Sequence, residues 1–395
     1  MKFSTAVIFT STTTMALAAS VRIRMPEGPV KPDSYIVMLK SATNMEDHIE
    51  SITRISARSP GSEFSITHRY EMLNGYSAHA TGTSLVRILT CPEVNYVEAD
   101  GTTSIDYDLH ERDATERDND GIEMEHDPVE LKARADGRRV TIYSLETGAL
   151  LEHACFDEEL HGWGHTVTGT DRVDTSGHGT YVAAKAVGQG FSLATFAYLK
   201  VVKIAESTTV LSSNLIAGIE WVYADSTKPP PEQRGSTIIL ITCSLRDRVA
   251  INEAVHKVIN SGLHVVASAG NDYRDAGEFG PASADGVITV GAVYCTATNQ
   301  YVITHSNYGK VISVFALGLN IESAWNGPGL EATRTRSGTA PAAASVASML
   351  ACALYQYGWM SPAEGKEGTR WHAEAVVVGQ PPSFIETTRL LAKFW

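Results

Sequence analysis

The alternation of buried strands with helices from about residue 137 onward constrains the fold of this chain most strongly. Short runs of β-branched and other apolar residues occupy 140–143, 196–202, 237–242, 265–268 and 287–293. Helical patterns separate them at 180–187, 212–225 and 250–261. Such alternation predicts an α/β fold with a mainly parallel sheet and helices on both faces. In such sheets the working site lies beyond the carboxyl ends of the strands.

Residues 33–100 have the pattern of a separate small domain. A strand-like run occupies 34–40, and a polar segment with Ile49, Ile52 and Ile55 at helical spacing follows it. Further strand-like runs include a final one at 92–98. This mixture predicts a small α+β domain that precedes the larger one.

Two other segments have compositions that are not typical of a folded domain. Residues 1–19 carry Lys2, a mildly apolar stretch and the small residues Ala16 and Ala18, which indicate a signal peptide and a secreted, extracellular protein. The alternative interpretation of this segment is a disordered tail. Residues 101–136 are acidic and poor in apolar side chains, which indicates a solvated linker. The second domain would then span 137–395.

Charge and composition exclude some classes of partner. The formal net charge is −13, so we expect no nucleic-acid partner, because that affinity depends on Lys and Arg meeting phosphates. No later segment approaches the roughly 20 apolar residues that a membrane span needs.

The cysteines and histidines of the chain do not have the spacings that are typical of metal ligands. The five cysteines are an odd number, so at least one thiol stays free even if the others pair. A metal site at His153, His161 and His165 is a minor alternative, because these histidines are irregularly spaced in what we expect to be one loop.

Four short motifs carry the chemistry of the larger domain. Residues 140–148 read VTIYSLETG and contain Glu146, and residues 176–183 read SGHGTYVA and contain His178. Residues 265–271 read VVASAGN and end at Asn271, whereas residues 336–347 read RSGTAPAAASVA and contain Ala340. Serine-hydrolase chemistry needs a hydroxyl, an imidazole, a carboxylate and a donor to the developing oxyanion. Glu146, His178 and Asn271 supply the carboxylate, the imidazole and the donor.

In this order, across roughly 250 residues, the motifs resemble those of the subtilases, and within them the proteinase K-like branch. The resemblance implies that Glu146, His178 and Ala340 stand at the positions of the catalytic triad and Asn271 at the oxyanion hole. Residues 33–100 resemble the inhibitor-type propeptide of the same family, which implies a ferredoxin-like fold for this small domain. We expect no cofactor; calcium is possible by the resemblance, with no ligand residues assigned.

The loss of the nucleophile decides the predicted activity. Ala340 has no hydroxyl, so no acyl-enzyme forms through it, and in subtilisin itself removal of that serine costs on the order of a million-fold in turnover. Ser337 reads as structural, and Ser345 lies about 7 Å further along a helix. Neither serine is expected to replace the lost one.

Other positions also depart from the family pattern. Glu146 is one methylene longer than the usual aspartate, so we expect its contact with His178 to loosen; a misplacement near 1 Å can cost about a hundredfold in rate. Pro341 follows the nucleophile position. Arg246 and Asp247 replace glycines that line the peptide groove, where an extended peptide adds as a strand. The plainer interpretation of that last change is a surface-loop substitution.

The sequence therefore predicts a catalytically inactive subtilisin-like protein, a pseudoprotease, with a binding or accessory role toward a protein or peptide partner. An alternative keeps weak hydrolysis or acid–base catalysis through His178 and Glu146. A third hypothesis is that the likeness to proteases reflects descent alone. Lacking its own nucleophile, the chain should keep its propeptide covalently attached unless another protease removes it.

Overall fold

The computed structural model describes residues 20–105, 139–228, 236–246, 249–295, 299–303, 305–378 and 386–395. The predicted signal peptide, nearly all of the predicted linker and Asp247 lie outside these residues. Within them, no helix has the length and apolar character needed to cross a membrane.

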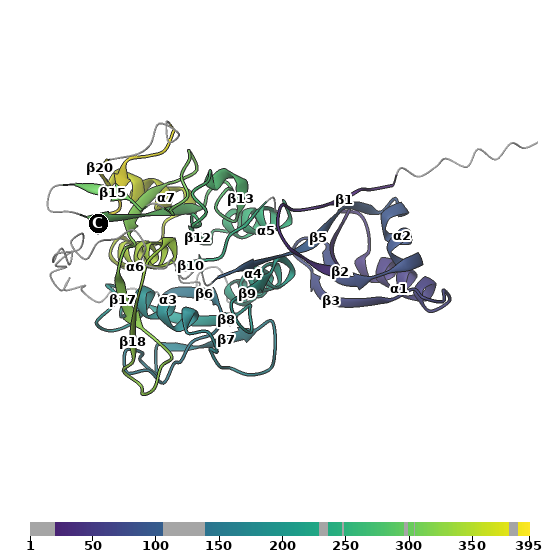
Figure 1. Cartoon of the computed structure of the whole chain (residues 1–395), viewed down its shortest axis with the longest axis horizontal. Helices are drawn as coiled ribbons and strands as arrows, with labels where there is room; N and C mark the ends of the chain where they lie inside the picture. The colour runs from purple at the N-terminus through teal and green to yellow at the C-terminus, as the bar shows by residue number, and fades with distance from the viewer. Residues whose placement is uncertain are drawn as a thin grey trace, which may run out of the picture.

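The N-terminal domain is a sheet with two helices, as the pattern predicted. The strand order is β1-β5-β2-β4-β3 (Figure 1). The strands are β1 (Ile23–Arg24), β2 (Val30–Leu39), β3 (Phe64–Tyr70), β4 (Gly75–Ala80) and β5 (Val94–Ser104), and the helices are α1 (Met45–Ser56) and α2 (Gly82–Thr90). Val37, Ile52, Tyr76 and Ile88 form the buried core between them. Strand β5 runs four residues past the expected domain end at residue 100, so 101–104 lie in a strand and not in a linker.

The larger domain is built on a mostly parallel sheet with the order β19-β21-β16-β14-β12-β10-β6-β8-β7. Its parallel strands are β6 (Val140–Glu146), β7 (His161–Thr166), β8 (Tyr198–Lys203), β10 (Ser236–Ile241), β12 (His264–Ser268), β14 (Ile288–Cys295), β16 (Val314–Leu317) and β21 (Leu390–Leu391). Strand β7 was not predicted, because His161 and His165 were expected in a loop. Its glycine-rich and polar sequence lacks the apolar run by which the other strands were recognised.

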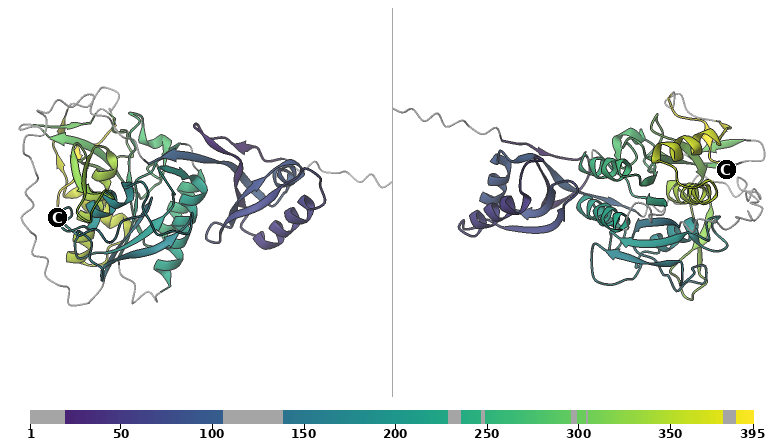
Figure 2. Two further views of the ribbon diagram at one scale, coloured as in Figure 1. Left: turned by 60° about the horizontal axis from the view of Figure 1, so that its bottom comes forward. Right: turned by 180° about the vertical axis from the view of Figure 1, so that it is seen from behind.

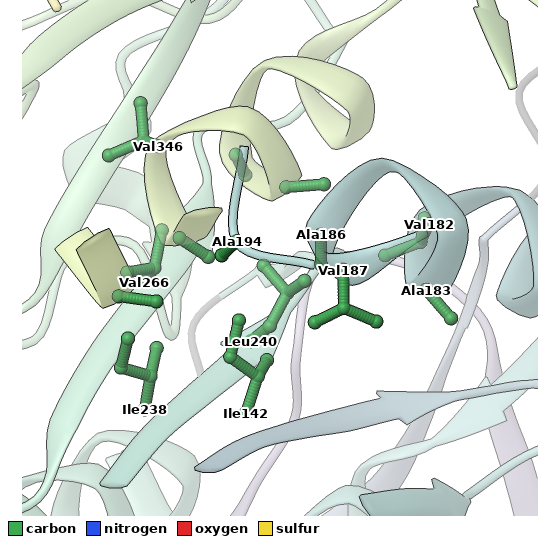
Figure 3. Close-up of a cluster of buried hydrophobic side chains, with 14 of the residues drawn as sticks. Ile142, Val182, Ala183, Ala186, Val187, Ala194, Ile238, Leu240, Val266 and Val346 are labelled. Atoms are coloured by element: carbon green, nitrogen blue, oxygen red, sulfur yellow. The ribbon is translucent and has the colours of Figure 1, made fainter. Parts of the chain in front are cut away.

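Helices cover both faces of this sheet, as predicted. They are α3 (His178–Val187), α4 (Ser212–Thr227), α5 (Val249–Asn260), α6 (Thr339–Tyr357) and α7 (Pro362–Trp371), with the 3-10 helix η2 at Ala276–Glu278. One core lies between the sheet and helices α3 and α6, and Figure 3 shows side chains such as Ile142, Val182 and Leu240 meeting there. The second core lies on the opposite face beneath α4 and α5.

Short strands complete the rim of the larger domain. They are β9 (Thr209–Leu211), β11 (Leu245–Arg246), β13 (Phe279–Gly280), β15 (Gln300–Val302), β17 (Ile321–Ala324), β18 (Thr333–Arg336), β19 (Glu374–Ala375) and β20 (Val377–Val378). The pairs β11–β13 and β17–β18 are separate antiparallel ribbons.

The two domains meet along strand β5 and helices α4 and α5 (Figures 1 and 2). The end of β5 leaves the small sheet and pairs antiparallel with β9 of the larger domain, with Thr103 opposite Val210. The chain therefore passes from one domain onto the surface of the other without leaving extended structure.

Candidate active site

Glu146 and His178 form a buried pair at the carboxyl edge of the sheet. Glu146 is the last residue of β6, and His178 is the first residue of α3. The Oε2 atom of Glu146 lies 2.9 Å from Nδ1 of His178, and the Thr242 hydroxyl donates to Oε1. The longer side chain therefore keeps its hydrogen bond to the ring, and the expected loosening of this contact is not what the geometry shows.

Glycines on both sides of His178 allow this close approach. Gly177 has a φ of +90°, and a Cβ there would lie 2.4 Å from the ring of Trp325. A Cβ on Gly179 would lie 2.0 Å from the backbone oxygen of Gly148. Gly179 therefore lets the start of α3 contact the backbone just after β6, and Gly177 leaves room for the Trp325 ring.

Asn271 and Ala340 face the same pocket as His178. The Oδ1 atom of Asn271 accepts hydrogen bonds from the Thr339 amide at 3.0 Å and from the Thr339 hydroxyl at 3.1 Å. These bonds orient the side-chain amide so that its NH₂ group remains available as a donor. Ala340, in the first turn of α6, is 8% exposed and presents a methyl group to the pocket.

The two serine hydroxyls on either side of Ala340 in sequence, those of Ser337 and Ser345, are engaged elsewhere. The Ser337 Oγ accepts a hydrogen bond from the Asn320 amide at 2.9 Å, and the Ser345 hydroxyl donates to the Pro341 carbonyl at 3.0 Å. Ser104 and Ser244 also line the pocket. In the part of the chain that the structure describes, the His178 ring has Glu146 as its only hydrogen-bond partner.

The Cys243 thiol, next to Thr242, does not supply a replacement nucleophile. Burial, and then the nearby Glu146 carboxylate, raise the pKa of Cys243 well above its ordinary value. The thiol therefore stays protonated, whereas the reactive form of cysteine is the thiolate.

Two residues that the sequence motifs did not indicate, both at the end of the N-terminal domain, line the pocket. Ser104 ends strand β5, and Ile105 follows it with its amide donating to the Thr208 carbonyl at 2.7 Å. The signal for this contact was one apolar residue, Ile105, at the start of an acidic segment. That signal is weak, because it identifies no partner.

Arg246, predicted to stand in place of a groove glycine, forms contacts of its own. Its guanidinium pairs with the carboxylates of Glu278 and of Glu27 in the N-terminal domain, and it lies 5.8 Å from the centre of the Phe279 ring. The side chain is therefore fixed at the domain boundary, which a solvated surface-loop residue would not be.

Comparison with known proteins identifies the family. The model of the subtilase family matches residues 137–384. This chain belongs to the subtilase family. Residues 34–106 match the peptidase inhibitor I9 family, which agrees with the resemblance of the N-terminal domain to an inhibitor-type propeptide.

Relatives of this subtilase extend along nearly the whole chain. Subtilisin-like protease 1 of Pseudogymnoascus destructans is 30% identical over 92% of both chains. Subtilisin-like protease 4 of Trichophyton rubrum is also 30% identical, over 91% of this chain and 90% of its own.

Two solved structures have the same fold. A cold-adapted subtilisin-like serine proteinase aligns with a TM-score of 0.58 and 27% identity over 67% of this chain and 92% of its own. Fervidolysin from Fervidobacterium pennivorans aligns with a TM-score of 0.70 over 95% of this chain and 63% of its own, at 16% identity.

The three histidines weighed as metal ligands are separated in this subtilase. His153 bonds the Ala332 carbonyl through Nε2 at 2.9 Å, and His161 Nδ1 accepts from the Asp157 amide at 3.0 Å. The His165 ring stacks on Trp221 with 5.2 Å between centres. They do not converge on one point. Calcium binding stays a prediction without assigned ligands.

Proposed function

We propose that this subtilase is a catalytically inactive family member, a pseudoprotease, that acts by binding another protein. The observation that supports this most directly is the methyl group of Ala340 in the pocket lined by His178 and Asn271. A methyl group has neither a lone pair to attack a carbonyl nor a proton for the imidazole to accept. The base and the oxyanion donor are thus present without a nucleophile to activate.

The propeptide-like domain is proposed to stay attached as a permanent part of the protein. Active relatives remove this domain with their own serine, which is missing here. Ser104 and Ile105 line the pocket. The β5–β9 pairing holds residues 102–104 against the larger domain. A partner would therefore contact a surface outside the cleft. Secretion, proposed from residues 1–19, places that partner in the extracellular space.

A second candidate function is residual catalysis, and the intact Glu146–His178 pair favours it. A carboxylate 2.9 Å from Nδ1 fixes the ring so that Nε2 can act as a general base. Water would then take the place of the missing hydroxyl, with Asn271 as the oxyanion donor.

Turnover of peptide and ester substrates separates the two candidates. We expect the purified full-length protein and its His178→Ala variant to hydrolyse both at the uncatalysed rate. The matched control is His79→Ala, which changes a histidine that pairs with Glu63 in the small domain. Turnover that disappears in His178→Ala and persists in His79→Ala would establish the enzyme instead.

The mass of the purified protein tests the retained propeptide. Secreted from a protease-deficient host, the protein should be one covalent chain that includes residues 33–395, with the N-terminus created by signal-peptide removal. A product cut between 105 and 137 under these conditions means that the chain cleaves itself, and contradicts the proposal.

A further inference from the structure

Three potential metal ligands converge in the N-terminal domain, far from the pocket in sequence. His48 lies on α1, Cys91 follows the end of α2, and Glu93 immediately precedes β5. Cys91 Sγ lies 3.7 Å from His48 Nδ1 and 3.5 Å from Glu93 Oε2, and the latter two atoms are 3.2 Å apart. His48 and Cys91 are buried, whereas the Glu93 side chain is 53% exposed.

These separations match three corners of a zinc tetrahedron. With Zn–S near 2.3 Å and Zn–N or Zn–O near 2.0–2.1 Å, tetrahedral geometry puts sulfur about 3.6 Å from nitrogen or oxygen. The same geometry puts nitrogen about 3.3 Å from oxygen. All three observed distances lie within about 0.2 Å of these values.

The orientation of His48 also favours a shared metal over a proton relay. In a catalytic relay the nucleophile and the carboxylate face opposite nitrogens of the imidazole. Here Cys91 and Glu93 both face Nδ1, while Nε2 lies 3.1 Å from the hydroxyl of Tyr76. A metal-binding histidine typically makes such a second hydrogen bond through its other nitrogen, which fixes the ring.

We propose that His48, Cys91 and Glu93 bind one Zn²⁺ ion, with water completing the tetrahedron on the exposed side of Glu93. Burial lowers the pKa of His48, which keeps the imidazole in its neutral, metal-binding form. Burial raises the pKa of the Cys91 thiol, so the ion must displace the proton when it binds. One thiolate and one carboxylate then balance the charge of the metal. The ion ties α1 to the segment between α2 and β5.

Cobalt spectroscopy on the full-length protein tests this site. The protein is purified without a histidine tag, stripped with chelator and titrated with Co²⁺ and then Zn²⁺. We expect one ion per chain, visible bands of tetrahedral cobalt and a near-ultraviolet thiolate-to-cobalt band that Zn²⁺ abolishes. The thiolate band reports on cysteine specifically, and the acidic segment 101–136 contains none.

Variants assign the ligands. Cys91→Ser and Glu93→Gln should weaken zinc binding by more than the 10–100-fold typical of losing an outer hydrogen-bond partner, and Tyr76→Phe by about that amount. Cys295→Ser, at a buried thiol of the larger domain, and Glu50→Gln, at an exposed carboxylate of α1, should bind as the unaltered chain does. Glu93 is exposed, so its isosteric replacement should fold normally. Absence of the thiolate band, or equal zinc affinity in Glu93→Gln, overturns the proposal.

Discussion

At the scale of single residues, the pocket holds a bonded carboxylate–imidazole pair and an amide, which the proposed function interprets as the remains of a catalytic site. Glu146 still reaches His178, and Asn271 is still held by Thr339. Ala340, at the proposed nucleophile position, has no hydroxyl on which these groups could act. Pro341 adds a backbone restriction, because a residue before proline is sterically disfavoured in the helical region that position 340 occupies. The direction of any side chain at 340 is therefore constrained by its neighbour.

Restoring the hydroxyl alone should not restore a protease. Ala340→Ser is expected to leave peptide turnover at least about a hundredfold below that of an active relative, because Pro341 restricts the backbone at position 340 and a hydroxyl misplaced by about 1 Å costs that much. Gel analysis should show no self-cleavage between 105 and 137. The double variant Ala340→Ser with His178→Ala gives the background. Robust turnover that depends on His178 would show that position 340 is the only defect.

Gly179 should be sensitive to the smallest possible enlargement. Its Cβ would lie 2.0 Å from the Gly148 carbonyl oxygen, which is backbone and cannot rotate away. We expect Gly179→Ala to lower the free energy of unfolding in urea by about 1–3 kcal/mol, as overpacking does. Gly162→Ala, where a Cβ meets no atom within 4 Å, is the matched control. Equal stability of the two variants would mean that α3 can shift freely.

At the scale of elements, buried polar side chains hold helices against the sheet. His264 begins β12 and bonds the Met360 carbonyl through Nε2 at 3.1 Å, just before α7 begins. A Cβ on Gly365 of α7 would lie 2.7 Å from its ring. Burial lowers the pKa of His264 to about 4. The packing of α7 therefore depends on a neutral imidazole.

Acid should lower the free energy of unfolding, because His264 must take up a proton at a site that disfavours it. The unfolded chain takes up a proton below pH 6.5, whereas the folded chain does so only near pH 4. The contribution of neutral His264 to the free energy of unfolding is therefore complete above pH 6.5. It is lost as the pH falls to 4, by a total of about 3 kcal/mol. Urea unfolding across this range should show a shallower pH dependence in His264→Gln than in the unaltered chain. Parallel curves would exclude His264 as a source of the effect.

At the scale of the whole molecule, the small domain supplies contacts that the larger one lacks. Helix α4 has Leu211 at its N-cap and no side-chain cap of its own. Asp100 of β5 accepts from the Ser213 amide at 2.9 Å, and Glu98 accepts from the Ala250 amide of α5 at 2.8 Å. Carboxylates stabilise helix N-termini by satisfying free amides and by opposing the helix dipole. Both helices are thus completed by the neighbouring domain.

The two domains should stay together after their connection is cut. A specific protease site inserted between 106 and 136 allows controlled cleavage, after which both fragments should elute together on size exclusion. Hydrogen bonds to charged groups contribute about 1.5–3 kcal/mol, so Asp100→Ala should weaken the association by about 10–150-fold.

Glu50→Ala, at an exposed carboxylate paired with Arg54 on α1, is the control and should leave the association unchanged. Separation of the unaltered fragments would show that the covalent connection alone joins the domains.

The amino-acid sequence by itself determined the α/β class, the small α+β domain before it and the motif residues Glu146, His178, Asn271 and Ala340. These features are encoded locally, in apolar periodicity and in runs of at most a dozen residues. Only the tertiary structure decided that Glu146 reaches the imidazole, that Ser104 and Ile105 line the pocket, and that Asp100 caps α4. It also brought His48 to Cys91 and Glu93. Each of these contacts joins residues more than 30 positions apart, where spacing along the chain carries no information about distance in space.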